Sequence, residues 1–263
     1  LSAAGESCVR ATETFISVFD GWIRSRDLMI RTYVEKPVVL FVVAGQSNAM
    51  GQGGRPPLET ADWAGTYWDW KDQESKALKP LRDPVYRCQQ RSAWPAFGKE
   101  FFLRTGRKVC ILNVAMGGAY VTDYGGANTW YGDDSILRQE ATTEWNACTA
   151  ALGTKGEDWV LGGLFWIQGE AETYRVYTGA TTVQAYRSGT LDVFSFFRTL
   201  TANPSLPIYM SQIGYQANLL ENPDRMNSFY AIQNAQSELA RTTENVHMVF
   251  EGAKYFARAG MMA

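Results

Sequence analysis

Histidine is almost absent from this chain of 263 residues, which holds one histidine, four cysteines and no Cys-x-x-Cys pair. Zinc sites are usually built from closely spaced cysteines and histidines, so we expect neither a metal nor a cofactor. The chain also lacks an apolar run of about eighteen residues, and we therefore expect no membrane span. With 25 basic and 27 acidic residues it offers no basic surface for nucleic acid.

Hydrophobic residues are abundant, at 46%, and a chain of this length can bury a substantial core. Five short apolar runs, which we predict as strands, lie at 38–44, 109–114, 159–166, 207–213 and 246–250. Segments with helical spacing lie between them, at 93–104, 136–152, 181–200 and 225–240. Strands that alternate with helices favour a parallel sheet covered on both faces. We therefore predict an α/β fold, a three-layer sandwich with a central, mostly parallel five-stranded sheet flanked by helices.

The first 36 residues are predicted to form a separate segment that precedes a domain over 37–263. Apolar residues at helical spacing within 11–24 predict an amphipathic helix, and 28–34 is strand-like. Such a helix must cover an apolar surface, either as a lid on the main domain or at a junction with a further module. Leu1 is not an initiator methionine, so we expect a processed chain or a piece of a longer one.

The stretch 38–51 organises the rest of the chain. Its apolar, largely β-branched run predicts a strand buried on both faces, and Gly45 then allows a tight turn that presents Ser47 at the strand's carboxyl end. Ligands of open parallel sheets bind at that edge. A plainer interpretation is a core strand followed by a serine that caps a helix. The glycines lack the Gly-Lys-Ser/Thr of a phosphate loop, and Ala49 breaks the Gly-x-Ser-x-Gly pattern of α/β-hydrolases.

Three motifs in order resemble a known family. The first is Gly45-Gln46-Ser47-Asn48-Ala49-Met50-Gly51, the second Met116-Gly117-Gly118-Ala119, and the third Trp166-Ile167-Gln168-Gly169-Glu170. Each follows a predicted strand. Together they resemble the blocks of SGNH hydrolases, in the branch of sialate O-acetylesterases related to carbohydrate esterase family six. The resemblance covers roughly 37–250 and implies the flavodoxin-like sandwich of that superfamily.

The resemblance implies a role for three residues in ester hydrolysis. Ser47 would be the nucleophile, and the oxyanion would be stabilised by the N–H groups of Ser47 and Gly117 and by the side-chain amide of Gln168. The alternative backbone donor to the oxyanion is Gly118, the neighbour of Gly117. The plainer interpretation of Gln168 is a buried amide that ties loops together.

Two acidic residues accompany the third motif. Glu170 is expected to be structural and to hydrogen-bond the loop that carries Ser47. Glu172 stands where many members of the family have Asp or Asn, and we assign it no role.

The catalytic base is where the sequence departs from the family. An Asp-x-x-His motif near the C-terminus supplies it in the family, whereas His247 is the only histidine here, with Glu244 three residues before it. Residues alternate around His247 as in a strand, and 245–249 resembles the family's last strand, which precedes that motif. We therefore expect the catalytic His and Asp beyond Ala263; the alternative is that Glu244 and His247 serve.

Two loops are rich in glycine and aromatic residues. The stretch 51–92 lacks periodicity, and a long loop of this kind is more often a binding loop than a linker. Its aromatic residues either stack on sugar rings or form satellite core; they are Trp63, Tyr67, Trp68 and Trp70. The second loop, 120–132, includes Trp130 and Tyr131 and is expected to rim the same pocket.

The resemblance implies a serine esterase that removes O-acetyl groups from a carbohydrate or polysaccharide. The alternative is a carbohydrate-binding module or pseudoenzyme that keeps the fold without a working base. A general lipase fits less well, because no long apolar lid is evident. The expected partner is an acetylated carbohydrate. The missing start is consistent with a larger multidomain or oligomeric surface or phage-tail protein, which would be extracellular or associated with a virion.

Overall fold

The computed structural model describes residues 8–10, 29–31, 36–51, 60–71, 74–86, 91–126, 128–214 and 223–251. The chain divides into two compact units, Leu1–Lys36 and Pro37–Ala263. In the first unit, β1 (Cys8–Arg10) pairs antiparallel with β2 (Met29–Arg31). Strand β2 falls within the strand predicted over 28–34. The helix predicted over 11–24 lies outside the described residues.

The second unit contains a sheet of seven strands in the order β5-β4-β6-β3-β7-β8-β9. Its strands are β3 (Val38–Gly45), β4 (Gly65–Asp69), β5 (Ala77–Pro80), β6 (Val109–Asn113), β7 (Trp159–Ile167), β8 (Ile208–Ser211) and β9 (Val246–Phe250). All neighbours are parallel except β5, which runs antiparallel to β4. The α/β fold and the mostly parallel sheet are thus confirmed.

The number of strands differs from the prediction, seven rather than five. The two additional strands, β4 and β5, lie in the stretch 51–92 that lacks periodicity and was expected to be a loop. Their sequences, Gly-Thr-Tyr-Trp-Asp and Ala-Leu-Lys-Pro, show neither a continuous apolar run nor the alternation that identifies a half-buried strand.

Six α-helices are described, α1 (Ser47–Met50), α2 (Trp94–Thr105), α3 (Ile136–Thr154), α4 (Glu170–Tyr177), α5 (Val183–Leu200) and α6 (Pro223–Thr242). A short 3-10 helix, η3, spans Asp62–Ala64. The four helices predicted from periodicity correspond to α2, α3, α5 and α6. Their ends follow local chemistry: Ser135 and Thr182 cap α3 and α5, and α2 ends at Gly106 in the left-handed conformation.

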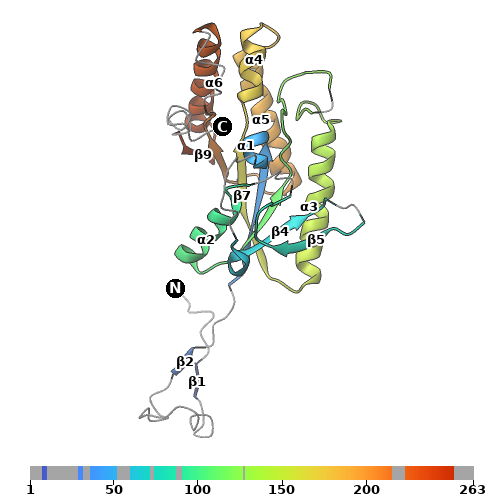
Figure 1. Ribbon diagram of the computed structural model, residues 1–263, viewed down its shortest axis with the longest axis vertical. Coiled ribbons are helices and arrows are strands. Elements are labelled where there is room, and N and C mark those ends of the chain that lie inside the picture. Colours follow the sequence, from blue (N-terminus) through green and yellow to red (C-terminus); the bar gives the residue numbers. More distant parts are fainter. Residues whose placement is uncertain are drawn as a thin grey trace. The chain divides into compact units, whose positions relative to one another are not determined.

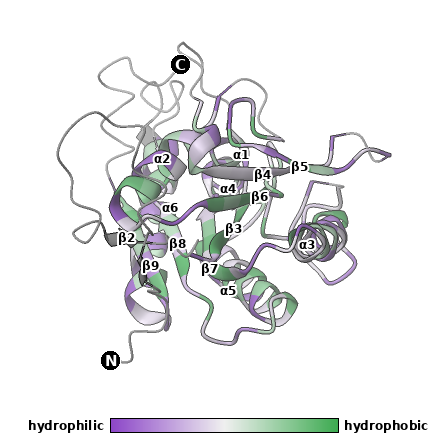
Figure 2. Cartoon of the chain, turned by 90° about the horizontal axis from the view of Figure 1, so that it is seen from below, coloured by the Kyte–Doolittle hydropathy of each residue, from purple (hydrophilic) through white to green (hydrophobic). Residues whose placement is uncertain are grey.

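Helices lie on both faces of the sheet (Figures 1 and 2), and the side chains of β3 alternate between two apolar clusters. Leu40 and Val42 pack in the apolar cluster that contains residues of α3, α5 and α6. Phe41 and Val43 belong to the cluster on the other face, which contains residues of α2. Both faces of β3 are therefore covered, which explains its unbroken apolar run.

An irregularity interrupts the pairing of β3 with β7. Leu40 pairs with Leu161 but Phe41 pairs with Gly163, so Gly162 is an extra residue in β7. A Cβ atom on Gly162 would lie 2.5 Å from the Phe41 ring. The small residue therefore lets an aromatic ring lie against the bulge.

Candidate active site

Ser47 lies at the carboxyl end of β3, where the strand turns into α1, and its side chain is partly exposed. Gly45 makes this turn with φ of +124°, and a Cβ atom at this position would lie 2.0 Å from the carbonyl oxygen of Ile167. Only glycine fits so close to the neighbouring strand in that conformation. The tight turn predicted from the sequence is therefore present.

Three buried side chains fix the backbone of this turn. The indole of Trp130 donates to the carbonyl oxygen of Gly45 at 3.1 Å, and the indole of Trp94 donates to that of Ala49 at 3.0 Å. The amide of Asn113 donates to the carbonyl oxygen of Met50 at 3.0 Å. Because these donors come from three distant segments, the turn is fixed before any ligand arrives.

The third motif contacts the same turn through side chains on either side of Ser47. The Oε1 atom of Gln46 accepts from the backbone N–H groups of Gly169 and Ala171, both at 3.2 Å, at the start of α4. The amide of Asn48 donates to Oε1 of Glu170 at 2.5 Å, which confirms the structural role predicted for Glu170. Sequence reasoning missed Gln46, whose role depends on a contact 123 residues away.

The carboxyl of Glu170 is buried, and burial raises its pKa, although hydrogen bonds from its own backbone N–H and from Asn48 oppose the shift. Its second oxygen, Oε2, has no hydrogen-bond partner in the described structure. A buried carboxyl with one unsatisfied oxygen favours the protonated form.

The second motif follows β6 and lies against the Ser47 turn. The N–H of Met116 donates to the carbonyl oxygen of Gly45 at 3.3 Å, and the chain then turns through Gly117 and Gly118, the latter with φ of +68°. Among the described residues, no hydrogen bond is made by the N–H groups of Ser47 and Gly117. Within the described part of the chain, two backbone donors without a hydrogen-bond partner therefore lie at this end of the sheet.

Gln168 is fully buried behind the second motif. Its Nε2 atom donates to the carbonyl oxygen of Ala119 at 3.1 Å, the contact expected of an amide that ties loops together. Its backbone carbonyl accepts from the side chains of Gln236 at 2.8 Å and Tyr186 at 3.3 Å. One N–H of the side-chain amide remains after the bond to Ala119, so the tether leaves a donor in place.

Glu172, to which the sequence assigned no role, anchors the loop that follows the two glycines. Its buried carboxylate accepts from the backbone N–H groups of Val121 and Thr122 at 2.8 and 3.1 Å. The hydroxyl of Thr122 donates to it as well. A glutamate two residues after the third motif was the only sequence signal for this contact.

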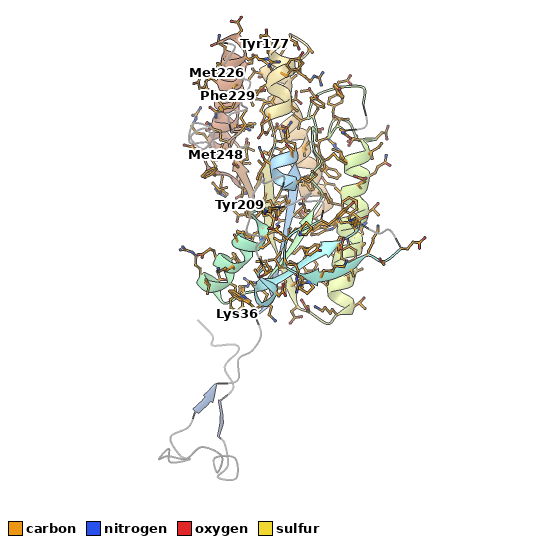
Figure 3. All side chains as sticks on the ribbon, in the orientation of Figure 1. Lys36, Tyr177, Tyr209, Met226, Phe229 and Met248 are labelled. Atoms are coloured by element: carbon orange, nitrogen blue, oxygen red, sulfur yellow. The ribbon has the colours of Figure 1, made fainter. Side chains whose placement is uncertain are left out.

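His247 lies in β9, the last strand at its edge of the sheet, three strands away from β3. Tyr209 and Met248 mark β8 and β9 in Figure 3. Strands are roughly 4.8 Å apart, so the lateral separation is about 14 Å. The register also aligns His247 through Tyr209 and Phe165 with Val43, four residues before Ser47. This arrangement confirms that His247 lies beyond hydrogen-bond reach of Ser47.

The aromatic residues of the two loops divide between core and surface. Tyr67, Trp68 and Trp70 are buried, which supports the interpretation as satellite core, whereas Trp63 is 48% exposed. The placement of Trp130 at the rim was wrong, because it is fully buried and packs beside Trp166. A glycine-rich loop suggests that Trp130 is exposed, but its indole is buried, where it donates to the carbonyl oxygen of Gly45.

Other chemistry in the described residues is limited. No group of three or more His, Cys, Asp or Glu side chains there could hold a metal ion. No described helix has the length and apolarity to cross a membrane. Cys110 and Cys148 are buried free thiols with their Sγ atoms 4.0 Å apart; their mutual hydrogen bond and burial raise the pKa of Cys148 well above its usual range.

Two solved structures share this fold. One is a protein from Arabidopsis thaliana, with a TM-score of 0.60, 16% identity, and coverage of 82% of this chain and 86% of that one. The other is NanS, with a TM-score of 0.56, 17% identity, and coverage of 84% and 81%. No curated protein matches the sequence.

A family model described as "Carbohydrate esterase, sialic acid-specific acetylesterase" matches residues 37–255. This range includes all three motifs and every strand of the seven-stranded sheet. The match confirms the resemblance inferred from the motifs. The chain therefore belongs to the carbohydrate esterase family of sialic acid-specific acetylesterases.

Proposed function

We propose that this acetylesterase removes O-acetyl groups from a carbohydrate through an acyl-enzyme intermediate, with Ser47 as the nucleophile. The observation that carries the proposal is the Ser47 turn, a partly exposed hydroxyl on a backbone fixed from three sides. Family membership supports the class of reaction. A serine needs a fixed position, donors for the oxyanion and a base, and the first two have candidates here.

In the proposed mechanism, Ser47 Oγ attacks the acetyl carbonyl carbon and loses its proton to a base. The oxygen that becomes negative is stabilised by the N–H groups of Ser47 and Gly117 and by the second N–H of the Gln168 amide. Collapse of the tetrahedral intermediate breaks the bond to the sugar oxygen, which takes a proton and leaves as a hydroxyl. Water then attacks the acetyl-serine and releases acetate. Each oxyanion donor contributes about 10² to 10³ in rate.

The base is proposed to be a group outside the described residues. Among those residues, no His, Asp or Glu side chain hydrogen-bonds the Ser47 hydroxyl, and His247 is three strands away. A general base must come within about 2.6–3.2 Å of the hydroxyl, although geometry without substrate can be looser.

Ser47→Ala tests the proposal. Acetate release is measured from acetylated oligosaccharides and from p-nitrophenyl acetate, for the 263-residue chain and for a chain extended past Ala263. We expect the substitution to abolish activity and to leave the melting temperature nearly unchanged. A fluorophosphonate should label Ser47 in the active protein. Activity close to that of the wild type in Ser47→Ala would eliminate this nucleophile.

The second candidate is a carbohydrate-binding protein that keeps the fold without catalysis. It is favoured by one observation, the lack of a base beside Ser47 among the described residues. It predicts that both lengths of chain bind the carbohydrate and release no acetate.

A further inference from the structure

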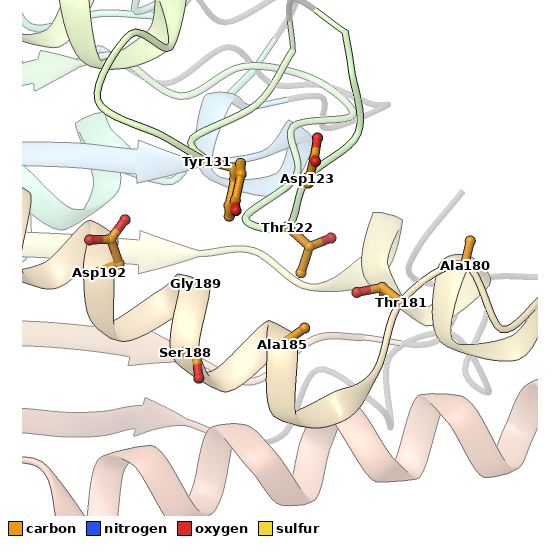
Figure 4. A pocket seen from close by; sticks show the side chains of 9 residues that line it. All are labelled: Thr122, Asp123, Tyr131, Ala180, Thr181, Ala185, Ser188, Gly189 and Asp192. Carbon is orange, nitrogen blue, oxygen red and sulfur yellow. The ribbon is translucent and has the colours of Figure 1, made fainter.

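A pocket of about 420 Å³ lies between α5 and the loop that follows Gly117 and Gly118 (Figure 4). The side chains that carry its chemistry are Thr122, Asp123, Tyr131, Thr181, Ser188 and Asp192. Its volume is in the range of small-ligand sites, about 300–1,000 Å³. None of these residues belongs to the proposed catalytic machinery.

The walls of this pocket are fixed. Helix α5 contacts the loop so closely that a Cβ atom on Gly189 would lie 2.1 Å from the carbonyl oxygen of Val121. Glu172 holds the same part of the loop through Thr122. Arg138 then joins the far part of the loop to α5, because its buried guanidinium donates to the carbonyl oxygen of Trp130 and to Asp192. The pocket is therefore formed without a ligand.

The lining has the chemistry that recognises a sugar. Tyr131 is 49% exposed, and its ring projects into the space above α5 in Figure 4. An aromatic face covers the apolar face of a pyranose, while carboxylates and hydroxyls hydrogen-bond its hydroxyl groups. Asp123 and Asp192 supply carboxylates, and Thr181 and Ser188 supply hydroxyls.

The charge of the lining selects against acidic sugars. Two carboxyl groups, Asp123 and Asp192, line the pocket, and no lysine or arginine is among its lining residues. Two guanidinium groups lie beside the lining, and both are engaged. Arg138 is bonded to Asp192 and to Asp133, and Arg175 donates to the backbone carbonyl oxygens of Asp123 and Ala180. A carboxylate on the ligand would meet the like charge of Asp123 and Asp192.

The pocket is close to the proposed reaction centre along the chain. Thr122 follows Gly118 by four residues, and four residues of extended chain span at most about 14 Å. A sugar in the pocket would therefore belong to the same oligosaccharide as an acetylated sugar at Ser47.

We infer that this pocket binds a neutral sugar residue of the same chain as the acetylated one, so that the substrate is an oligosaccharide or polysaccharide. The inference rests on the proposed function for its link to catalysis. Binding itself does not require Ser47, and the two ideas can therefore fail separately.

The test is titration calorimetry of the 263-residue chain with four neutral hexasaccharides (xylo-, manno-, cello- and chitohexaose) and with hexagalacturonate. Two variants change opposite walls of the pocket. Tyr131→Ala deletes the aromatic face, and Ala185→Trp fills the space. Two matched controls change exposed residues that do not line the pocket, Tyr230→Ala on α6 and Leu191→Trp on α5. Asp123→Asn replaces either pocket variant that fails to fold.

We expect at least one neutral hexasaccharide to bind, tenfold more tightly than hexagalacturonate. Each pocket variant should weaken that binding at least tenfold, and each control less than twofold. Ser47→Ala should bind as the wild type does, which separates this result from the fate of the catalytic proposal. Failure of all four neutral sugars to bind, equal binding of the acidic sugar, or equal losses in pocket and control variants would each overturn the inference.

Discussion

Ser47 and His247 occupy two positions in one sheet that differ in how firmly the fold holds them. Ser47 follows a central strand, and its turn receives hydrogen bonds from Trp94, Asn113 and Trp130. His247 is an exposed residue of the terminal strand β9, and its ring contacts Tyr209 with ring centroids 6.0 Å apart. A catalytic side chain must be held in a fixed position, and a residue beside a central strand is held by neighbours on both sides, whereas a residue of a terminal strand is not. Four substitutions test this contrast.

The largest effect is expected for Gly45→Ala, at the centre. A methyl group would meet the carbonyl oxygen of Ile167 at 2.0 Å, on a backbone with φ of +124°. Positive-φ strain alone costs about 1–3 kcal/mol, and the clash adds to it. We expect a loss of more than about 3 kcal/mol in the free energy of unfolding, measured by urea denaturation.

Gly156→Ala is the matched control, because Gly156 also has positive φ, +70°, but has open space around it. It should cost about 1 kcal/mol. Equal losses at the two positions would mean that the close contact between β3 and β7 is not what requires glycine at position 45.

Gln168→Ala should lower kcat of the active protein by about 10² to 10³ with a modest effect on KM. The loss would come from the second N–H of the amide, which acts on the transition state. Glu172→Gln serves as the control, since it loosens the same loop and removes no oxyanion donor. If both variants lose the same activity, Gln168 acts only as the tether to Ala119.

Glu170→Gln should change how stability depends on pH. Burial raises the pKa of this carboxyl, so its contribution to stability is fully present below the unfolded value of about 4.5 and is lost as pH rises through the folded pKa. Glutamine can still accept the hydrogen bond from Asn48 and carries no charge. The variant should therefore gain stability relative to the wild type as pH rises, measured by melting temperature from pH 4 to 8. A constant difference across this range would contradict the raised pKa.

His247→Gln should have the smallest effect. The residue is exposed in an edge strand, and such substitutions change stability by about 0.5 kcal/mol or less. Activity of the extended chain should stay within twofold of the wild type. Loss by several orders of magnitude would instead make His247 the base and remove the contrast with Ser47.

The sequence predicted those parts of the fold that have a continuous apolar run or a helical period. The five predicted strands and the helix α5 are such cases, and each of the three motifs lies at the carboxyl end of one of those strands. The strands β4 and β5 have neither an apolar run nor alternation, and the helix α4 has only eight residues.

The contacts that shape the candidate site could not be read from the chain, because each joins residues far apart in sequence. Trp130 and Gly45 are 85 residues apart, and Glu172 and Val121 are 51 apart. In both cases a polar atom had to be satisfied inside the core, and local composition carries no record of its partner.

The extra residue in β7 makes deletions in this strand unequal. Leu161 pairs with Leu40 and Gly163 with Phe41, so removing Gly162 would leave the partners on both sides unchanged and only straighten the strand. Removing the regularly paired Leu164 instead would move Phe165 and Trp166 to opposite faces, away from Phe97 and Phe194. The third motif would then begin out of phase with the Ser47 turn. A deletion of Leu164 should thus do far more harm than a deletion of Gly162, two positions earlier.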